Sequence, residues 1–486
     1  MSTTTISTHS PVAARTRPQL SVVWLGFLVV LASAVMDLLD STIAQTAAPA
    51  IQRDLGGSYA ALEWISAAYT LAMSATLLLG SRLGDAFGRR RVLLVGMGGF
   101  VGASALCALA PTSTALIAGR TLQGALAAVM VPQGFGLVRE LFGDEGQQKA
   151  FAVFGPVMGL AAVAGPLLGG GLVNLDVLGT GWRAIFLVNV PVGLLAIVAG
   201  RRYLPRVAPA TPGLRLDAVS VLMAMAGTTA LVYPLVEGRS LGWPAWSFAL
   251  LAGGAVTLGA FGLLQRRRAR QGRTPLVEPS ILRRRPYVAG LAVVVGFIGA
   301  MGGMMIAFNV MFQVGLGFSP LACGVATVAI PVAAIGGSIT SSALLARIGR
   351  GTMQIGIATM AVGLLAVDVV MRSAGGGLSA WELAGPLALA GFGMGMVFVP
   401  MFDVILAGVA PHQVGSASGL LESIQQLAMS LGIAAVGTVL FNAVGAGHGA
   451  GAFVGAADHA LLVAVGFLVA AGAAVLWLPK HARQAH

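Results

Sequence analysis

Long apolar segments alternate with short polar connections along nearly the whole chain. A membrane-spanning helix needs about 20 consecutive apolar residues, and segments of that length recur from one end to the other. They lie at 21–48, 60–80, 92–111, 114–138, 150–174, 183–203, 216–236, 244–265, 288–313, 320–346, 352–371, 382–409, 416–444 and 457–479. The runs lack the two-residue alternation of a transmembrane barrel. The pattern predicts an all-α polytopic membrane protein with 14 spans.

Composition supports an integral membrane protein. Of the 486 residues, 57% are hydrophobic and 9% are charged, whereas soluble domains carry about 25% charged residues. The 68 glycines are typical of helices that pack closely in lipid.

The formal net charge of +12 indicates how the chain is oriented in the membrane and does not indicate nucleic-acid binding. Basic residues cluster between spans, as in 89-RRR-91, 266-RRRAR-270 and 283-RRR-285, without interleaved aromatic residues. If the first span starts in the cytoplasm, 24 of the 29 Lys and Arg residues lie on the cytoplasmic side and 4 outside. We therefore expect both termini to be cytoplasmic. Abundant Arg, Ala and Gly with little Lys indicate a bacterium, and hence its cell (inner) membrane.

The longest connection, 266–287, is rich in Arg and Pro and resembles a linker between two halves. The first apolar run is too long for a signal peptide, so we expect an uncleaved span. The predicted organisation is a cytoplasmic tail at 1–20, a six-helix bundle at 21–205, an extra two-helix insertion at 206–265, a basic cytoplasmic linker at 266–287, a second six-helix bundle at 288–479 and a cytoplasmic tail at 480–486. Two bundles around a midplane site are common among secondary transporters.

Charged residues lie inside predicted spans, among them Asp37, Asp40 and Arg120. Asp37 and Asp40, in 35-VMDLLDSTI-43, are three positions apart and therefore share a helix face. An Asp at the centre of a span costs about 2.5 to 3.5 kcal/mol, so such residues usually face protein or a water-filled cavity. Arg120 must likewise find a carboxylate or carbonyls in the interior, unless it extends to the outer surface.

Four motifs carry a resemblance to a known family. They are 81-SRLGDAFGRRRVLL-94, 116-LIAGRTLQGALAA-128, 159-GLAAVAGPLLGGGL-172, and the pair 38-LLDSTIAQTAAPAI-51 and 182-WRAIFLVNVPVG-193. Together they resemble the signatures of the major facilitator superfamily, in its fourteen-helix drug:proton antiporter branch. The chain departs from the usual pattern at Ser81, where Gly is common, and at Ala86, where a basic residue is common.

The resemblance implies a major facilitator fold with two extra transmembrane helices. It implies a proton-coupled antiporter that exports drug-like or antibiotic-like small molecules by alternating access, and so a multidrug efflux or antibiotic-resistance protein. The expected partners are a lipophilic substrate, protons and the lipid bilayer, with no nucleic acid. We expect a monomer that uses the proton gradient and no cofactor.

Proton coupling is expected at Asp40, Arg120 and Asp37. Burial favours the neutral form of a carboxyl group and a nearby Arg favours the ionised form, so separation of Asp40 from Arg120 would change its proton affinity. Asp37 would recognise cations or bind a second proton.

The predicted substrate cavity adds polar residues from several spans: Gln123, Asn309, Gln313, Asp403, Glu422 and Gln425, together with Asp37. Asp403 and Glu422 share a depth, and either one of them lines the cavity or both pack or pair at the cytoplasmic rim. The glutamines could equally be packing contacts between helices.

A conformational latch is expected at Asp85, Gly88, Arg89 and Arg139, with Asp85 paired to Arg139 by family analogy. The alternative is an ordinary loop carboxylate among arginines that set topology. The antiporter motif comprises Gly165, Pro166, Gly169 and Gly170, which provide a small helix face and a kink. Plain close packing is the alternative, and the resemblance favours export.

Two other function classes are compatible with a polytopic membrane chain. An importer or facilitator on the same fold is disfavoured only by the resemblance. A polytopic enzyme or receptor is disfavoured because HExxH, GxSxG and Walker motifs are absent, so we expect no enzyme. Cys107 and Cys323 lie far apart in sequence in apolar segments, which predicts no disulfide and no metal site.

Overall fold

The computed structural model describes residues 20–56, 59–175, 179–209, 218–238, 241–273, 275–312, 317–318, 325–374, 380–406, 409, 413–444 and 450–479. These residues form helices and connections and contain no strand. Within them, 13 helical segments are long and apolar enough to cross a membrane, and each coincides with a predicted span. The remaining predicted span, 150–174, is part of a longer helix. The all-α polytopic fold is therefore confirmed, and the count of 14 spans is close to the 13 found.

The first group of helices runs to residue 203. It contains α1 (Leu20–Leu55), α2 (Tyr59–Phe87), α3 (Arg89–Ala108), α4 (Ser113–Met130), α5 (Gln133–Leu175), the short η2 (Gly181–Arg183), α6 (Ala184–Leu187) and α7 (Asn189–Tyr203). Thr112 starts α4 by accepting a hydrogen bond from the backbone N–H of Ala115. α5 breaks at Gly143, whose φ of 66° favours glycine, so its first turns continue the fourth span.

The second group begins after two intervening helices. α8 (Ala218–Glu237) and α9 (Ala245–Arg270) come first, followed by η3 (Ile281–Arg283). The group itself contains α10 (Arg285–Val310), α12 (Ala329–Ile348), α13 (Gly351–Ala374), α14 (Ala380–Leu406), α15 (Val414–Val444) and α16 (Ala450–Val475). One hydrophobic cluster spans this group, from Ile281 to Leu478, and separate clusters fill the first group.

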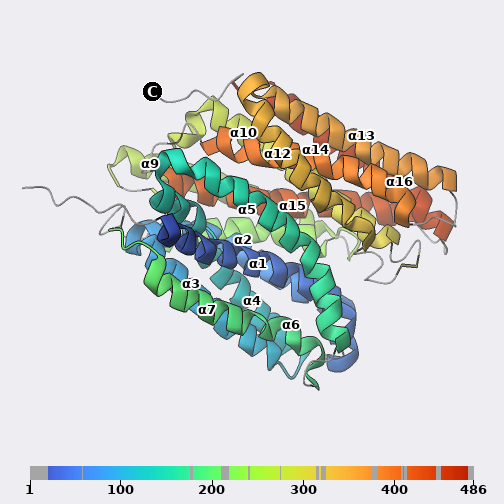
Figure 1. Ribbon diagram of the computed structural model, residues 1–486, viewed down its shortest axis with the longest axis horizontal. Helices are drawn as coiled ribbons and strands as arrows, with labels where there is room; N and C mark the ends of the chain where they lie inside the picture. The colour runs from blue at the N-terminus through green and yellow to red at the C-terminus, as the bar shows by residue number, and fades with distance from the viewer. Residues whose placement is uncertain are drawn as a thin grey trace, which may run out of the picture.

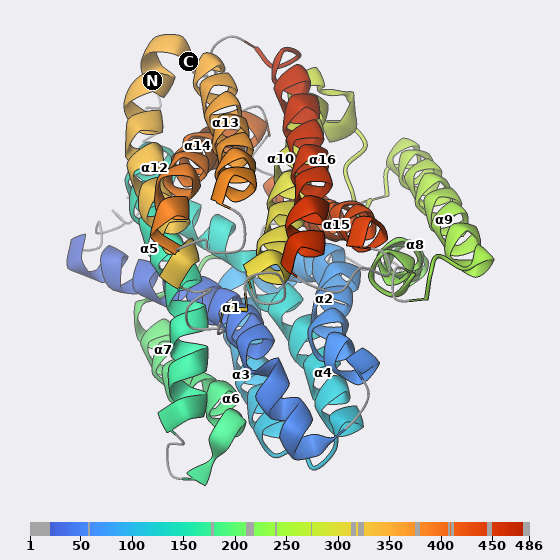
Figure 2. The same ribbon diagram turned by 90° about the vertical axis from the view of Figure 1, so that its right-hand side faces the viewer.

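The two groups lie against each other along α2 and α15 and along α5 and α12 (Figures 1 and 2). α8 packs against both α2 and α15, and in Figure 2 the α8–α9 pair stands beside the two groups. The turns at 89–91 and 201–206 and the connection at 266–285 lie at one end of the molecule, called here the arginine-rich end. From this end the two groups diverge toward the opposite end (Figure 1).

Close contact between α2 and α4 depends on a glycine. A Cβ atom on Gly124 would lie 2.2 Å from the backbone oxygen of Tyr69, which no real side chain tolerates. The absence of a side chain lets the two backbones meet, as in other small-residue helix contacts in membranes. This contact brings the Arg120 turn of α4 directly against α2.

Candidate functional site

Arg120 and Asp40 form a buried ion pair between α4 and α1. Arg120 is 1% exposed and Asp40 is 2% exposed, so both side chains are internal. Arg120 Nη1 also donates to Gln123 Oε1 at 2.8 Å, and Nε donates to the backbone carbonyl of Ile65 at 3.1 Å. Its guanidinium carbon lies 4.3 Å from the ring centroid of Tyr69. The cation is therefore compensated by charge, carbonyl and ring together.

Asp40 accepts further hydrogen bonds from two amides. Gln123 Nε2 donates to Asp40 Oδ1 at 2.8 Å and to Ser104 Oγ at 2.8 Å. Asn189 Nδ2, at the start of α7, donates to the same Asp40 oxygen at 2.7 Å. Together with Arg120, three side chains therefore donate to this one carboxyl group. The cluster thus joins α1, α3, α4 and α7 through one charged group.

Sequence reasoning placed Asp40, Arg120 and Gln123 at the site but did not single out Asn189, Ser104 or Tyr69. Asn189 had a visible signal, because it is the one polar side chain in the stretch 184-AIFLVNVPVG-193. A hydroxyl such as Ser104 or Tyr69 carries no comparable signal, since both residue types occur in spans for packing alone.

Asp37 lies one turn before Asp40 and makes different contacts. Its Oδ1 accepts a hydrogen bond from the Tyr69 hydroxyl of α2. Glu422, on α15 of the second group, lies within electrostatic range of Asp37. Glu422 is 8% exposed, and its Oε2 has no hydrogen-bond partner within the described part of the chain. Asp37 and Glu422 therefore bring carboxyl groups from both helix groups into one region.

Of the four remaining residues predicted to line the cavity, the structure describes the side chain of Gln425. Gln425 is half-buried on α15, three positions after Glu422. Asn309 lies in α10 and Asp403 in α14, but their side chains are outside the described set. Gln313 lies outside the described residues altogether.

The predicted latch residues gather at the arginine-rich end. Asp85 forms ion pairs with Arg82 (Nη1–Oδ2 3.5 Å) and Arg89 (Nη2–Oδ1 3.3 Å). Arg89 Nη1 reaches Glu140 Oε1 at 3.3 Å, on the first turns of α5. Gly88 joins α2 to α3 with a φ of 88°, a conformation that favours glycine.

Glu140 was not singled out from the sequence, although it directly follows Arg139. Arg139 is half-buried on the same helix, and its pairing with Asp85 stays a prediction. The ion pairs of Asp85 and Arg89 connect the α2–α3 turn to α5.

The antiporter motif on α5 packs against α1, the helix that carries Asp40. A Cβ atom on Gly165 would lie 2.0 Å from Thr42 Oγ1, two positions after Asp40 on α1. Gly169 is buried on the same helix, while Pro166 and Gly170 are helical and their burial is outside the described set. The small face of α5 therefore lies against the Leu39 and Thr42 face of α1, on a different side of that helix from Asp40.

Comparison with known proteins identifies the family. The sequence matches the profile described as Major Facilitator Superfamily over residues 30–216 and 208–433. The chain belongs to the major facilitator superfamily. It is 42% identical to a probable actinorhodin transporter of Streptomyces coelicolor over 424 residues, covering 87% of this chain and 73% of that protein. It is 36% identical to the puromycin resistance protein of Streptomyces alboniger, covering 92% of this chain and 88% of that protein.

Solved structures agree on the fold. A crystal structure of an auto-inhibited POT family peptide transporter superposes with a TM-score of 0.64 at 17% identity, covering 95% of this chain and 98% of that chain. The named relatives support the drug-efflux branch of the superfamily that the motifs indicated. This superfamily member is a multi-pass membrane protein.

Proposed function

We propose that this superfamily member exports drug-like or antibiotic-like small molecules from the cytoplasm in exchange for protons. The observation that carries the proposal is the buried Asp40–Arg120 pair, held by Gln123 and Asn189. A titratable carboxyl group that is buried in a membrane beside a permanent cation more often has a functional role than a stabilising one. The names of the actinorhodin and puromycin relatives support antibiotics as the substrate class.

Orientation follows from charge. The arginine-rich end lies in the cytoplasm of a bacterial cell, and both termini lie on the same side. At this end the two helix groups touch, because a Cβ on Gly419 of α15 would lie 2.3 Å from Ser81 Oγ of α2. In the proposed cycle this contact closes the cytoplasmic side, as in the outward-facing step of alternating access.

Proton binding at Asp40 would change the contacts of α1. A neutral carboxyl no longer compensates Arg120, and the new O–H needs an acceptor in place of the Gln123 or Asn189 donor. Protonation therefore loosens α1 from α4 and α7, and deprotonation restores the cluster. The energy comes from the proton gradient, and the exporter acts as a monomer without a cofactor.

Asp37 and Glu422 contribute to substrate recognition in this proposal. They come from opposite helix groups, so a cationic substrate between them contacts both halves. Such a substrate would stabilise the step in which these two carboxylates are close.

The test is transport into inverted membrane vesicles driven by a pH gradient, with a panel of cationic, neutral and anionic compounds. We expect gradient-dependent uptake by the wild-type protein and none by Asp40→Asn, which keeps the size of the side chain but does not titrate. Substrate binding measured on the same variant should persist. Full gradient-driven uptake by Asp40→Asn would contradict the role of Asp40 and direct attention to Glu422 or Asp403.

A further inference from the structure

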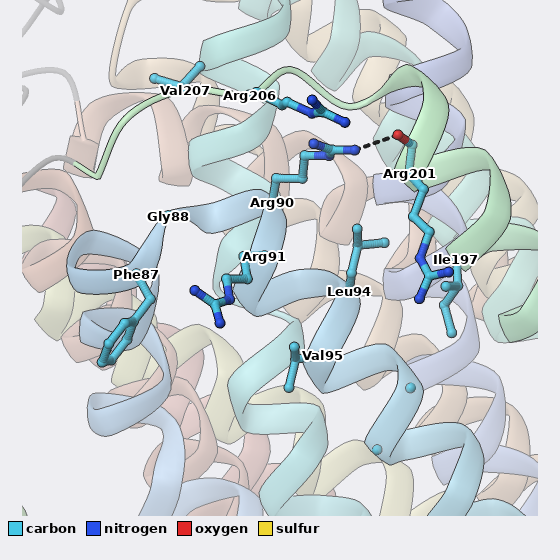
Figure 3. Close-up of a pocket in the computed structure, with 12 residues that line it drawn as sticks. Phe87, Gly88, Arg90, Arg91, Leu94, Val95, Ile197, Arg201, Arg206 and Val207 are labelled. Carbon is cyan, nitrogen blue, oxygen red and sulfur yellow. Dashed lines mark hydrogen bonds between the residues drawn. The ribbon is translucent and has the colours of Figure 1, made fainter.

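α3 and α7 enclose a groove at the arginine-rich end, away from the buried ion pair. The cavity has a volume of about 600 Å³, and Figure 3 shows its lining. Arg90, Arg91, Arg201 and Arg206 surround its mouth, and its floor is apolar. The proposed transport function makes no use of this groove.

The four arginines are uncompensated among the described residues, where none forms an ion pair with a carboxylate. Arg90 is held in place, because it donates to the backbone carbonyl of Arg201 and to that of Gly200 at 3.4 Å. Arg91, Arg201 and Arg206 are exposed. Arg206 lies close enough to Arg90 for their charges to repel. A bound anion would relieve this repulsion.

Beyond the arginines, glycines of α3 leave the floor of the groove open. A Cβ atom on Gly98 would meet only Ile197 Cδ1, at 3.9 Å, and one on Gly102 would meet nothing within 4 Å. Val95 and Leu106, on the same face of α3, are 64% and 56% exposed. The groove thus continues into an apolar helix surface that faces the membrane.

We propose that this groove binds an anionic phospholipid. The phosphate of the headgroup lies beside Arg90 and Arg206, whose side chains adjoin, while Arg91 and Arg201 add positive charge on either side (Figure 3). An acyl chain follows α3 past Gly98 and Gly102. Basic clusters between helices, at the depth of the headgroups, suit anionic lipids. A free phosphate ion would use the arginines but gain nothing from the apolar floor, so the combination favours a lipid.

The site adjoins the predicted latch. Arg90 follows Arg89, which pairs with Asp85 and Glu140. Lipid binding therefore stabilises the first turn of α3 next to these ion pairs.

The test is native mass spectrometry of the full-length protein in detergent, titrated with phosphatidylglycerol or with phosphatidylcholine of the same acyl chains. We expect tighter binding of phosphatidylglycerol. Replacing Arg91→Gln and Arg206→Gln together should weaken it about 30-fold, at about 1 kcal/mol for each Arg. The matched control, Arg202→Gln with Arg267→Gln, removes the same charge from exposed arginines outside the groove and should have no effect.

Gly98→Leu distinguishes a lipid from a soluble anion. The new side chain fills the groove without meeting protein atoms closer than 3.9 Å at its Cβ, so the fold should persist, and a thermal melt checks this. We expect Gly98→Leu to bind phosphatidylglycerol more weakly than the wild-type protein. Millimolar inorganic phosphate should not displace phosphatidylglycerol from the wild-type protein. Equal binding of the two lipids would overturn the proposal. The proposal would also be overturned if inorganic phosphate readily displaced phosphatidylglycerol from the wild-type protein and Gly98→Leu left phosphatidylglycerol binding unchanged. The site would then serve a soluble anion.

Discussion

Arg82 of α2 donates a hydrogen bond of 2.6 Å from Nε to the backbone carbonyl of Leu276, in the linker that follows α9. A second guanidinium nitrogen donates to the carbonyl of Pro275 at 2.8 Å. The same linker donates from the backbone N–H of Glu278 to Ser416 Oγ, at the start of α15. One short segment therefore holds the arginine-rich ends of both helix groups together.

The α8–α9 pair secures this linker. Gln265 of α9 accepts a hydrogen bond of 2.7 Å from the N–H of Leu276 and donates one to Ser220 of α8. Leu276 and Val277 are buried with Phe261 of α9. The two additional helices thus support a connection that must release if this end of the transporter opens.

Arg82→Gln should favour opening of the arginine-rich end. The substitution removes charge-assisted hydrogen bonds of about 1.5 to 3 kcal/mol each. Spin labels at Phe87 of α2 and Ile348 of α12, both exposed, report the separation of the groups in a background without native cysteines. We expect a longer distance distribution in Arg82→Gln and no change in the control Arg202→Gln. An unchanged distribution in both would show that the linker does not restrain the groups.

The Asp40–Arg120 pair should be strongly coupled in stability. Removing either charge alone leaves a buried uncompensated group, with an expected loss of about 3 to 5 kcal/mol. Arg120→Gln and Asp40→Asn should therefore each lower the melting temperature in detergent, and the double variant should lose much less than the two losses combined. Additive losses would mean that the two side chains are stabilised independently.

Asp37→Asn and Glu422→Gln should each weaken binding of cationic compounds and spare neutral ones. The reason is that both carboxylates belong to one region and interact electrostatically. Binding of a matched cationic and neutral pair, measured by fluorescence, tests the selectivity. Asp54→Asn is the control, because Asp54 is exposed at the far end of α1. Equal loss for cationic and neutral compounds would indicate a structural role instead.

Asp54 should stabilise the protein only above acidic pH. Trp182 Nε1 and Arg183 Nη1 donate to Asp54 Oδ2 at 2.8 and 2.7 Å, and these hydrogen bonds lower the pKa of Asp54 from 3.8. A lowered pKa gives a stabilisation that is complete above the unfolded value and is lost as the pH falls through the folded value. Asp54→Asn should therefore lower the melting temperature at pH 7, and the difference should shrink below pH 3.8. A constant difference across this range would exclude the ionised carboxylate as its source.

Much of the architecture could be predicted from local pattern. The transfer of about 20 apolar residues into lipid is a property of the segment itself, so within the described ranges 13 membrane-spanning helical segments lie where apolar runs predicted them. The fourth span shows the limit of this reasoning. α4 ends at Met130, and α5 begins at Gln133 and breaks at Gly143. The sequence pattern did not predict these breaks, because they depend on single residues that leave the mean hydropathy of the segment unchanged.

The site divides in the same way. From the sequence alone, charged residues in apolar runs had to face the interior, since lipid solvates neither Asp40 nor Arg120. Their arrangement depends on tertiary structure. Arg120 is 80 positions from Asp40 in the sequence, and Asn189 is 149 positions from Asp40, yet both donate to that carboxyl group. Asp37 lies within electrostatic range of Glu422, which belongs to the other helix group. Hydrophobicity determines that a helix crosses the membrane, but its rotation and neighbours follow from packing at positions such as Gly124 and Gly165. For that reason the sequence determined which residues carry charge inside the membrane, and only the packed structure decided which of them meet.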